Sequence, residues 1–174
     1  SLGLTASDSE LVNITAGNLT FVTTGNVTVD GVSSTNTTNI SNTFTIQAGN
    51  QLTFANNDSA FQNALDAQAN SGITVSRNIS IVNGGINLDA DVDNTGGGTL
   101  IVDSNANVDS NNLGLSITAD DIDITAGNLN SGSNTTTITD SDGTGIGFGN
   151  VTLGLNLSDA ELANISSENL TLET

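Results

Sequence analysis

Alternating carboxylates in one acidic segment are the residues with the clearest capacity for chemistry. In the stretch LDADVDNTGGG, Asp89, Asp91 and Asp93 are separated by single apolar residues. Oxygen ligands at the first, third and fifth positions are typical of calcium-binding loops. An EF-hand loop would need Gly in place of Asn94 and Glu in place of Leu100. The segment is therefore a candidate Ca²⁺ site, and the alternative is a strand with an acidic outward face.

A second acidic segment, DSDGTGIGFG, places Asp140 and Asp142 two residues apart. Their carboxylates are candidate ligands for a cation, or they form a turn with Gly143. The residue types imply no other cofactor, and we predict that none is required. Because neighbouring carboxylates repel one another, divalent cations should stabilise this protein whether or not a discrete site exists.

The overall charge excludes several classes of partner. The chain of 174 residues carries 19 carboxylates against one basic residue, Arg77, for a net charge of -18. Nucleic-acid binding needs Lys and Arg to neutralise phosphates, so we predict no nucleic-acid partner. No apolar run approaches the roughly 20 residues of a spanning helix, so we predict no membrane insertion. The absence of Cys excludes disulfides and thiolate metal sites and leaves the compartment open.

Short runs in which apolar residues alternate with Thr, Ser, Asn or Asp dominate the chain. Such alternation is typical of half-buried β-strands. The breaks between runs carry Gly, Asn or Asp, which tolerate tight turns. The sequence therefore predicts an all-β fold from runs such as LTFV, NVTVD, TFTIQ, QLTFA, GITVS, NISIV, GINLDADVD, TLIVD, LGLSIT, DIDIT and TTTITD.

The end of the chain repeats its beginning. The segments 2–21 and 153–172 align without a gap at an offset of 151 residues, with 12 identities in 20 positions. The simplest explanation is a tandem array. We divide the chain into one β-solenoid repeat unit, residues 1–151, and the start of the next repeat, residues 152–174, within one continuous solenoid.

Recurring turn motifs favour a solenoid over a sandwich or a barrel. Ala-Gly-Asn occurs at residues 16–18, 48–50 and 126–128. In a β-helix one corner recurs in successive coils, and stacked Asn side chains form ladders. With about 20 residues in each coil and about 4.8 Å between coils, one unit would advance the axis by roughly 35 Å.

Two segments depart from the strand pattern. In DSAFQNALDAQANSG, Phe61 and Leu65 are four residues apart, so we predict one short amphipathic helix near residues 58–71. Ser7-x-x-Glu10 recurs as Ser158-x-x-Glu161, and this capping-box pattern predicts one helical turn at each place.

Two stretches resemble the repeats of filamentous-haemagglutinin-type bacterial surface proteins and of large β-strand-repeat exoproteins. They are LTASDSELVNITAGNLTFVTTGNVTVDG and LSDAELANISSENLTLET, and the likeness is looser from Phe61 to Ile124. The resemblance implies a right-handed parallel β-helix, secretion to the bacterial cell surface, and a role in adhesion, biofilm or an extracellular fibre. It specifies coil geometry more than activity.

From the residues and the resemblance we expect a stiff extracellular rod or filament. Its partners would be neighbouring repeats, identical chains in a fibre, and host or matrix glycans. One alternative is the stalk of an adhesin whose binding tip lies elsewhere. Another is a polysaccharide-degrading enzyme, since β-helices host such activities. We predict that the chain is not an enzyme, because it lacks Lys and His and has only Arg77 to neutralise an acidic glycan.

Overall fold

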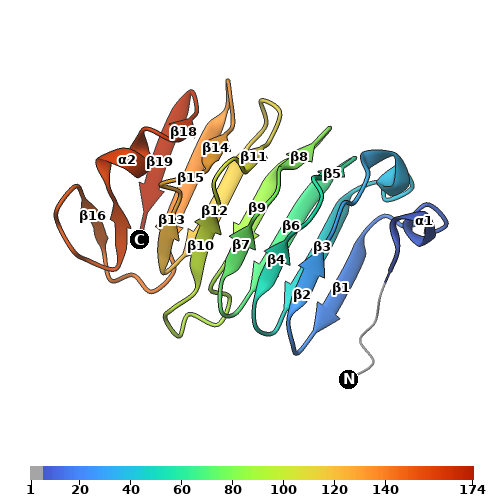
Figure 1. The fold of residues 1–174 in the computed structure, drawn as a ribbon, viewed down its shortest axis with the longest axis horizontal. Helices are drawn as coiled ribbons and strands as arrows, with labels where there is room; N and C mark the ends of the chain where they lie inside the picture. Colours follow the sequence, from blue (N-terminus) through green and yellow to red (C-terminus); the bar gives the residue numbers. More distant parts are fainter. Residues whose placement is uncertain (1–5) are drawn as a thin grey trace.

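The computed structural model describes residues 6–174, and its architecture is an all-β parallel solenoid (Figure 1). Every strand pair in it is parallel. Successive strands of one sheet are separated in the chain by strands of the other sheets, so each turn of the chain adds one layer. The described ends of the chain therefore lie at opposite ends of the molecule. This confirms the predicted all-β solenoid.

Three sheets form the walls. The first has seven strands in the order β1-β3-β6-β9-β12-β15-β19, which span Leu19–Thr23, Thr43–Ala48, Ala64–Ala69, Ile86–Asp89, Leu115–Ala119, Thr135–Asp140 and Asn169–Glu173. The second has the order β13-β10-β7-β4-β2, spanning Asp121–Asp123, Thr99–Val102, Ile73–Val75, Leu52–Phe54 and Val27–Val29. The third has the order β18-β14-β11-β8-β5, spanning Ile165–Ser166, Asn128–Asn130, Asn107–Asp109, Ile79–Ile81 and Ser59–Phe61. A small pair, β16 (Ile146–Phe148) and β17 (Leu155–Leu157), lies at the C-terminal end.

The interior is a single aliphatic column with a short aromatic stack near one end. Alternate residues of each strand point inward, which is why β3, β6 and β15 show strict alternation of half-buried and buried positions. Phe44 packs against Phe21 with ring centroids 5.6 Å apart and against Phe61 with centroids 5.1 Å apart. Burying each large apolar side chain in such a column contributes about 1.5–3 kcal/mol.

The strand register is in phase with the sequence repeat. Starting at Leu19 and following aligned residues across the first sheet leads to Phe44, Leu65, Ile86, Leu115, Thr136 and finally Leu170. Leu170 is the repeat counterpart of Leu19, 151 residues later. One sequence period therefore equals a whole number of coils, namely the six steps between the seven strands.

The coils are longer and less uniform than the sequence predicts. The register offsets between successive strands of the first sheet are 25, 21, 21, 29, 21 and 34 residues. Three of the six coils are close to the expected 20 residues and the other three are longer, so the predicted advance of roughly 35 Å is wrong. Six inter-strand steps of about 4.8 Å give an axial advance of about 29 Å for one period. In the longest step, from β15 to β19, the additional residues form β16, β17 and α2, and within residues 6–174 the second sheet ends at β13.

The helix predicted near residues 58–71 is absent, and this part of the prediction is wrong. The segment forms β5 (Ser59–Phe61) and β6 (Ala64–Ala69) instead. Leu65, Ala67 and Ala69 are buried, which is the period of a strand. Since β3 and β9 supply backbone partners on both sides, tertiary pairing overrides the helix propensity of Ala, Leu and Gln. At the start of the segment, the carboxylate of Asp58 accepts hydrogen bonds from the backbone and side chain of Asn78 in the next coil.

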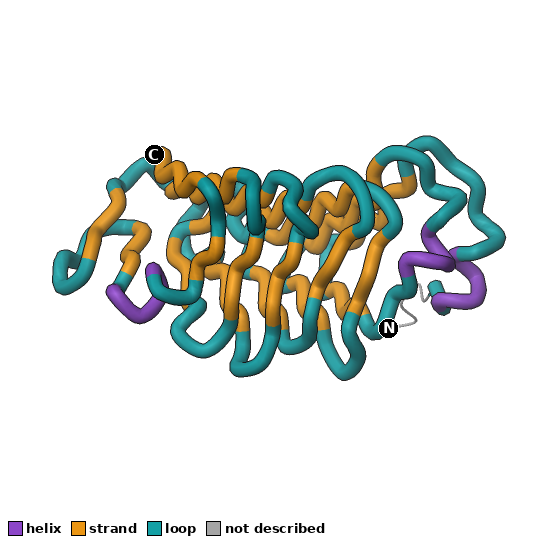
Figure 2. Tube along the Cα trace, turned by 90° about the horizontal axis from the view of Figure 1, so that it is seen from above, coloured by secondary structure: helices purple, strands orange, loops and turns teal. Residues whose placement is uncertain are grey.

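The two capping boxes each form the predicted single helical turn. They are α1 (Asp8–Leu11) and α2 (Asp159–Leu162), with bounds that differ by the repeat offset of 151 residues. A third turn, the 3₁₀-helix Ser34–Thr37, lies near α1. Seen from above, α1 and α2 lie at opposite ends of the strand layers (Figure 2). The repeated capping box thus forms the same helical turn at both ends.

The three Ala-Gly-Asn motifs do not mark one recurring corner, contrary to the prediction. The motif at residues 48–50 joins β3 to β4, whereas those at 16–18 and 126–128 lead into β1 and β14. At Gly49 the constraint is close approach: a Cβ there would lie 2.6 Å from the backbone carbonyl of Thr24 in the preceding coil. Corners in this solenoid are therefore set by local backbone packing more than by one repeated motif.

Candidate functional site

The three alternating carboxylates of the first acidic segment do not converge. Asp89 is half-buried at the end of β9, and its Oδ1 accepts a hydrogen bond of 3.2 Å from the backbone N–H of Asp91. Asp93 is exposed and accepts a hydrogen bond of 2.9 Å from the hydroxyl of Thr95. Asp91 is fully buried, at 0 % exposure. Burial raises the pKa of Asp89 above its ordinary value, and the charges of Asp91 and Asp66 add to the effect.

Instead, the fold brings Asp91 to the second acidic segment. The hydroxyl of Ser141 donates a hydrogen bond of 2.7 Å to Oδ2 of Asp91. Asp140, beside Ser141, is an inward-facing residue of β15 aligned with Ala119 and is 2 % exposed. Its Oδ2 accepts a hydrogen bond of 2.7 Å from the backbone N–H of Gly145. We call Asp91, Asp140, Ser141 and Asp142 the acidic corner.

Three carboxylate oxygens at the acidic corner are buried without a hydrogen-bond partner. They are the Oδ1 atoms of Asp91, Asp140 and Asp142. Buried polar atoms normally have a partner in protein or ordered solvent, so each such atom needs an explanation. Partial burial raises the pKa of Asp142, and the negative charges of Asp120, Asp91 and Asp140 raise it further.

The carboxylates are not yet gathered around one point. Among residues 6–174, no group of three or more His, Cys, Asp or Glu side chains is already arranged to hold a metal ion. Ion binding at the acidic corner would therefore require side-chain rotation, and Asp142 is the half-buried member of the three carboxylates.

Sequence reasoning missed two contributors to this corner. Ser141 bonds to a carboxylate 50 residues away, and Asp120 lies beside Asp142 from an intervening coil. Oδ2 of Asp120 also accepts a hydrogen bond of 2.9 Å from the backbone N–H of Gly97. In the sequence, the acidic loop was the one sign of this corner. No local pattern specifies which coil supplies the residues that pack against the loop.

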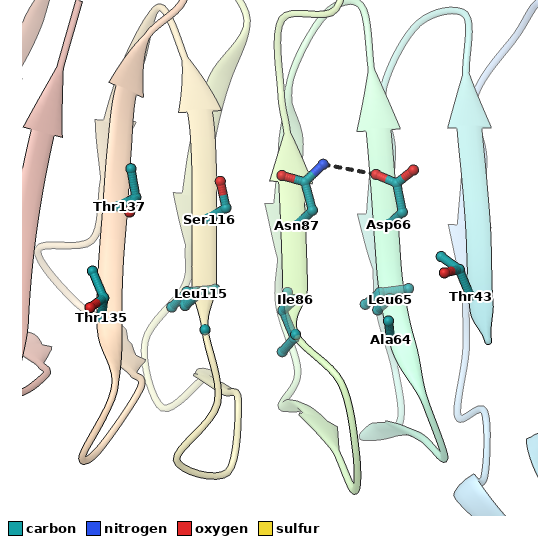
Figure 3. Close-up of a pocket in the computed structure, with 12 residues that line it drawn as sticks. Thr43, Ala64, Leu65, Asp66, Ile86, Asn87, Leu115, Ser116, Thr135 and Thr137 are labelled. Atoms are coloured by element: carbon teal, nitrogen blue, oxygen red, sulfur yellow. Dashed lines mark hydrogen bonds between the residues drawn. The ribbon is translucent and has the colours of Figure 1, made fainter. Parts of the chain in front are cut away.

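A shallow groove of about 520 Å³ crosses the outer face of the seven-stranded sheet (Figure 3). Asp66 and Asn87 lie side by side on the neighbouring strands β6 and β9, and Asn87 Nδ2 donates to Asp66 Oδ1 at 2.8 Å (Figure 3). Gln68 Nε2 donates to the second oxygen of Asp66 at 3.0 Å and in turn accepts a bond of 2.8 Å from Gln47. Because both oxygens of Asp66 are engaged in this ladder, the groove offers a polar hydrogen-bonding surface rather than a free general acid or base.

The N-terminal end of the described chain exposes the end of the aliphatic column. A pocket of about 390 Å³ there has a largely apolar lining, which includes Leu11, Phe21, Val27, Val29, Phe44 and Ile46. At the other end, the equivalent coil is covered: β19 pairs with β15, and β18 pairs with β14. The second copy of the repeated motif therefore packs on a preceding coil, whereas residues 6–21 have no such coil among the described residues.

Comparisons with known proteins add no family to this description. No helix among residues 6–174 has the length and apolar character needed to cross a membrane. No protein-family model matches the chain, and the searches of curated proteins and of solved structures found no match.

Proposed function

We propose that the chain is a segment of a stiff extracellular rod built from tandem six-coil units. The single observation that carries this proposal is the register, which leads from Leu19 to Leu170 through six whole steps. A period that ended part-way through a coil would rotate the next copy relative to the first. A period of whole coils lets the next copy extend the same three walls.

The two copies of the repeated motif support continuous stacking. In the second copy, β19 lies on β15 with Thr136 aligned to Leu170. By the offset of 151 residues, the same strand of a preceding unit would pair with β1 and align its Thr136 equivalent with Leu19. This contact would cover the apolar pocket at the N-terminal end, and each added unit would lengthen the rod by about 29 Å.

The outer surface suits a role in water. Outward positions of the first sheet carry mainly Thr, Ser, Asn, Gln and Asp, and the net charge of -18 keeps such rods apart. In solenoids, stability grows with nearest-neighbour contacts, so length is adjustable by copy number. The polar surface and the resemblance of the repeated segments support the proposal that the rod lies at the bacterial cell surface.

A two-unit protein tests the proposal. Residues 1–151 would be fused directly to residues 1–174, and small-angle scattering would measure its length and cross-section. We expect the long dimension to increase by about 29 Å with an unchanged cross-section. The melting temperature should also rise, because the second pocket is covered.

The matched control carries a flexible Gly-Ser linker at the junction of the same two units. It should behave as two independent bodies with the melting temperature of the single unit. Identical scattering from the direct and the linked fusions would contradict the proposal. Electron microscopy of the native cell surface then separates uniform fibres from anchored rods with a distal knob.

A further inference from the structure

The acidic corner lies where one coil is longer than its neighbours. Between β9 and β12 the register offset is 29 residues, whereas it is 21 for the coils on either side. Most of the additional length forms the loop that follows Ala90 and contains Asp91. This loop reaches past the coil of Asp120 to meet Ser141. The corner therefore connects segments that belong to coils two steps apart.

Burial at this corner leaves negative charge without a partner. Asp91 and Asp140 are 0 % and 2 % exposed, and one oxygen of each has no hydrogen bond. Burying an ionised carboxylate costs several kcal/mol unless a charge of opposite sign or strong hydrogen bonds compensate it. Arg77, the chain's one Lys or Arg, donates instead to the carbonyls of Asn56 and Ser76. A compensating positive charge would therefore come from outside the chain.

We propose that the acidic corner binds one divalent cation, with Ca²⁺ preferred, through the carboxylates of Asp91, Asp140 and Asp142. The unpartnered oxygen of each carboxylate supplies one ligand, and water completes the shell. Ca²⁺ accepts six to eight oxygen ligands in flexible geometry, whereas Mg²⁺ demands a near-ideal octahedron and retains its water. Asp120 adds negative charge beside the site. The inference does not depend on the proposed rod function.

The structural consequence is a clamp between coils. Ser141 already joins Asp91 to the β15 coil by a hydrogen bond. A bound cation would add stronger links from Asp91 to Asp140 and Asp142 across the intervening coil. We expect the calcium form to unfold at a higher temperature and the loop after Ala90 to become more protected from hydrogen exchange.

Calorimetric titration and thermal melting test the site at neutral pH and fixed ionic strength. With Ca²⁺ added to the chelator-treated full chain, we expect one ion per chain and a rise in melting temperature of several degrees. Asp91→Asn should lower the affinity by about tenfold or more. Mg²⁺ should bind more weakly than Ca²⁺.

Asp93→Asn is the matched control, because it removes the same charge from the same loop at an exposed position. Its calcium affinity should stay close to that of the parent. Asp142→Asn removes another proposed calcium ligand at a partly exposed position. If Asp91→Asn fails to fold, the calcium affinity of Asp142→Asn still tests the site. Circular dichroism establishes that each variant is folded.

Three outcomes would overturn the inference. One is the absence of binding heat and of any thermal shift at millimolar Ca²⁺. Another is an equal loss of affinity in Asp93→Asn and Asp91→Asn, which would mean diffuse attraction to the acidic surface. The third is that the parent protein has the same melting temperature in chelator and in calcium, while Asp142→Asn melts at a higher temperature in both. That result would mean that the carboxyls with unpartnered oxygens are protonated.

Discussion

The hydroxyl of Ser141 donates a hydrogen bond of 2.7 Å to Oδ2 of Asp91, although 50 residues separate the two in the chain. Asp91 is fully buried, and its other oxygen has no partner. The bond is therefore the one direct polar contact to this side chain among the described residues. Its geometry depends on two loops from different coils meeting at one corner.

Replacing Ser141 with Ala should destabilise the chelator-treated protein by about 1.5–3 kcal/mol, because a hydrogen bond to a buried charged group is lost. Urea unfolding followed by circular dichroism measures the difference. Ser104→Ala, at an exposed position, is the control and should change the free energy of unfolding by less than about 0.5 kcal/mol. Equal effects from the two substitutions would show that the Ser141 bond contributes nothing specific.

Gly49→Ala should destabilise the protein by about 1–3 kcal/mol, because overpacking displaces the neighbouring coil. The added Cβ would lie 2.6 Å from the backbone of Thr24. Gly114→Ala is the matched control, since a Cβ there meets no atom within 4 Å. Thermal melting of both variants and the parent protein measures the difference. If both variants had the melting temperature of the parent, the packing argument would be contradicted.

Phe61→Ala should lower the free energy of unfolding by about 3–5 kcal/mol through the cavity that it leaves. The ring is fully buried and stacks on Phe44. Val22→Ala removes an apolar side chain from the same solenoid at a position 69 % exposed, so its effect should be small. Denaturant unfolding of the two variants compares buried and exposed apolar groups directly. A small effect of Phe61→Ala would contradict the packing of the interior.

Asp121 should make the protein more stable in mild acid. Burial raises the pKa of Asp121 above the ordinary 3.8, and the charges of Glu161 and Asp120 act in the same direction. The folded state then holds this proton more tightly than the unfolded chain. The resulting stability is complete below the unfolded pKa and is lost as pH rises through the raised folded pKa. We expect the melting temperature in chelator to rise as the pH falls from 7 to about 4.5. The Asp121→Asn variant should show a smaller rise over the same range.

Asp30→Asn is the control for that pH dependence. Hydrogen bonds from the side chains of Asn57 and Asn56 lower the pKa of Asp30 below 3.8. Its contribution is present above the unfolded pKa and is lost as pH falls through the lowered folded pKa. Asp30→Asn should therefore leave the slope above about pH 4.5 unchanged. Equal flattening by both variants would assign the slope to total charge instead of to burial at Asp121.

The strands and the ends of the chain were predictable because their signals are local. Alternation in TFTIQ and in TTTITD requires only that successive side chains point to opposite faces, and both form strands, β3 and β15. The capping boxes at Ser7 and Ser158 involve partners three residues apart, and both form helical turns. The repeat offset was equally visible as sequence identity.

The amino-acid sequence by itself determined the strand pattern, the acidity and the repeat length of 151 residues. Only the tertiary structure decided that Ser59–Phe61 and Ala64–Ala69 are strands, because their backbone partners come from neighbouring coils: β8 for the first, β3 and β9 for the second. It also decided that Asp91 bonds to Ser141, between Asp140 and Asp142 in the chain, 50 residues away from its own acidic segment. Such groupings depend on which coil each loop reaches. That depends on the strand register between segments far apart in the chain, which no local sequence pattern encodes.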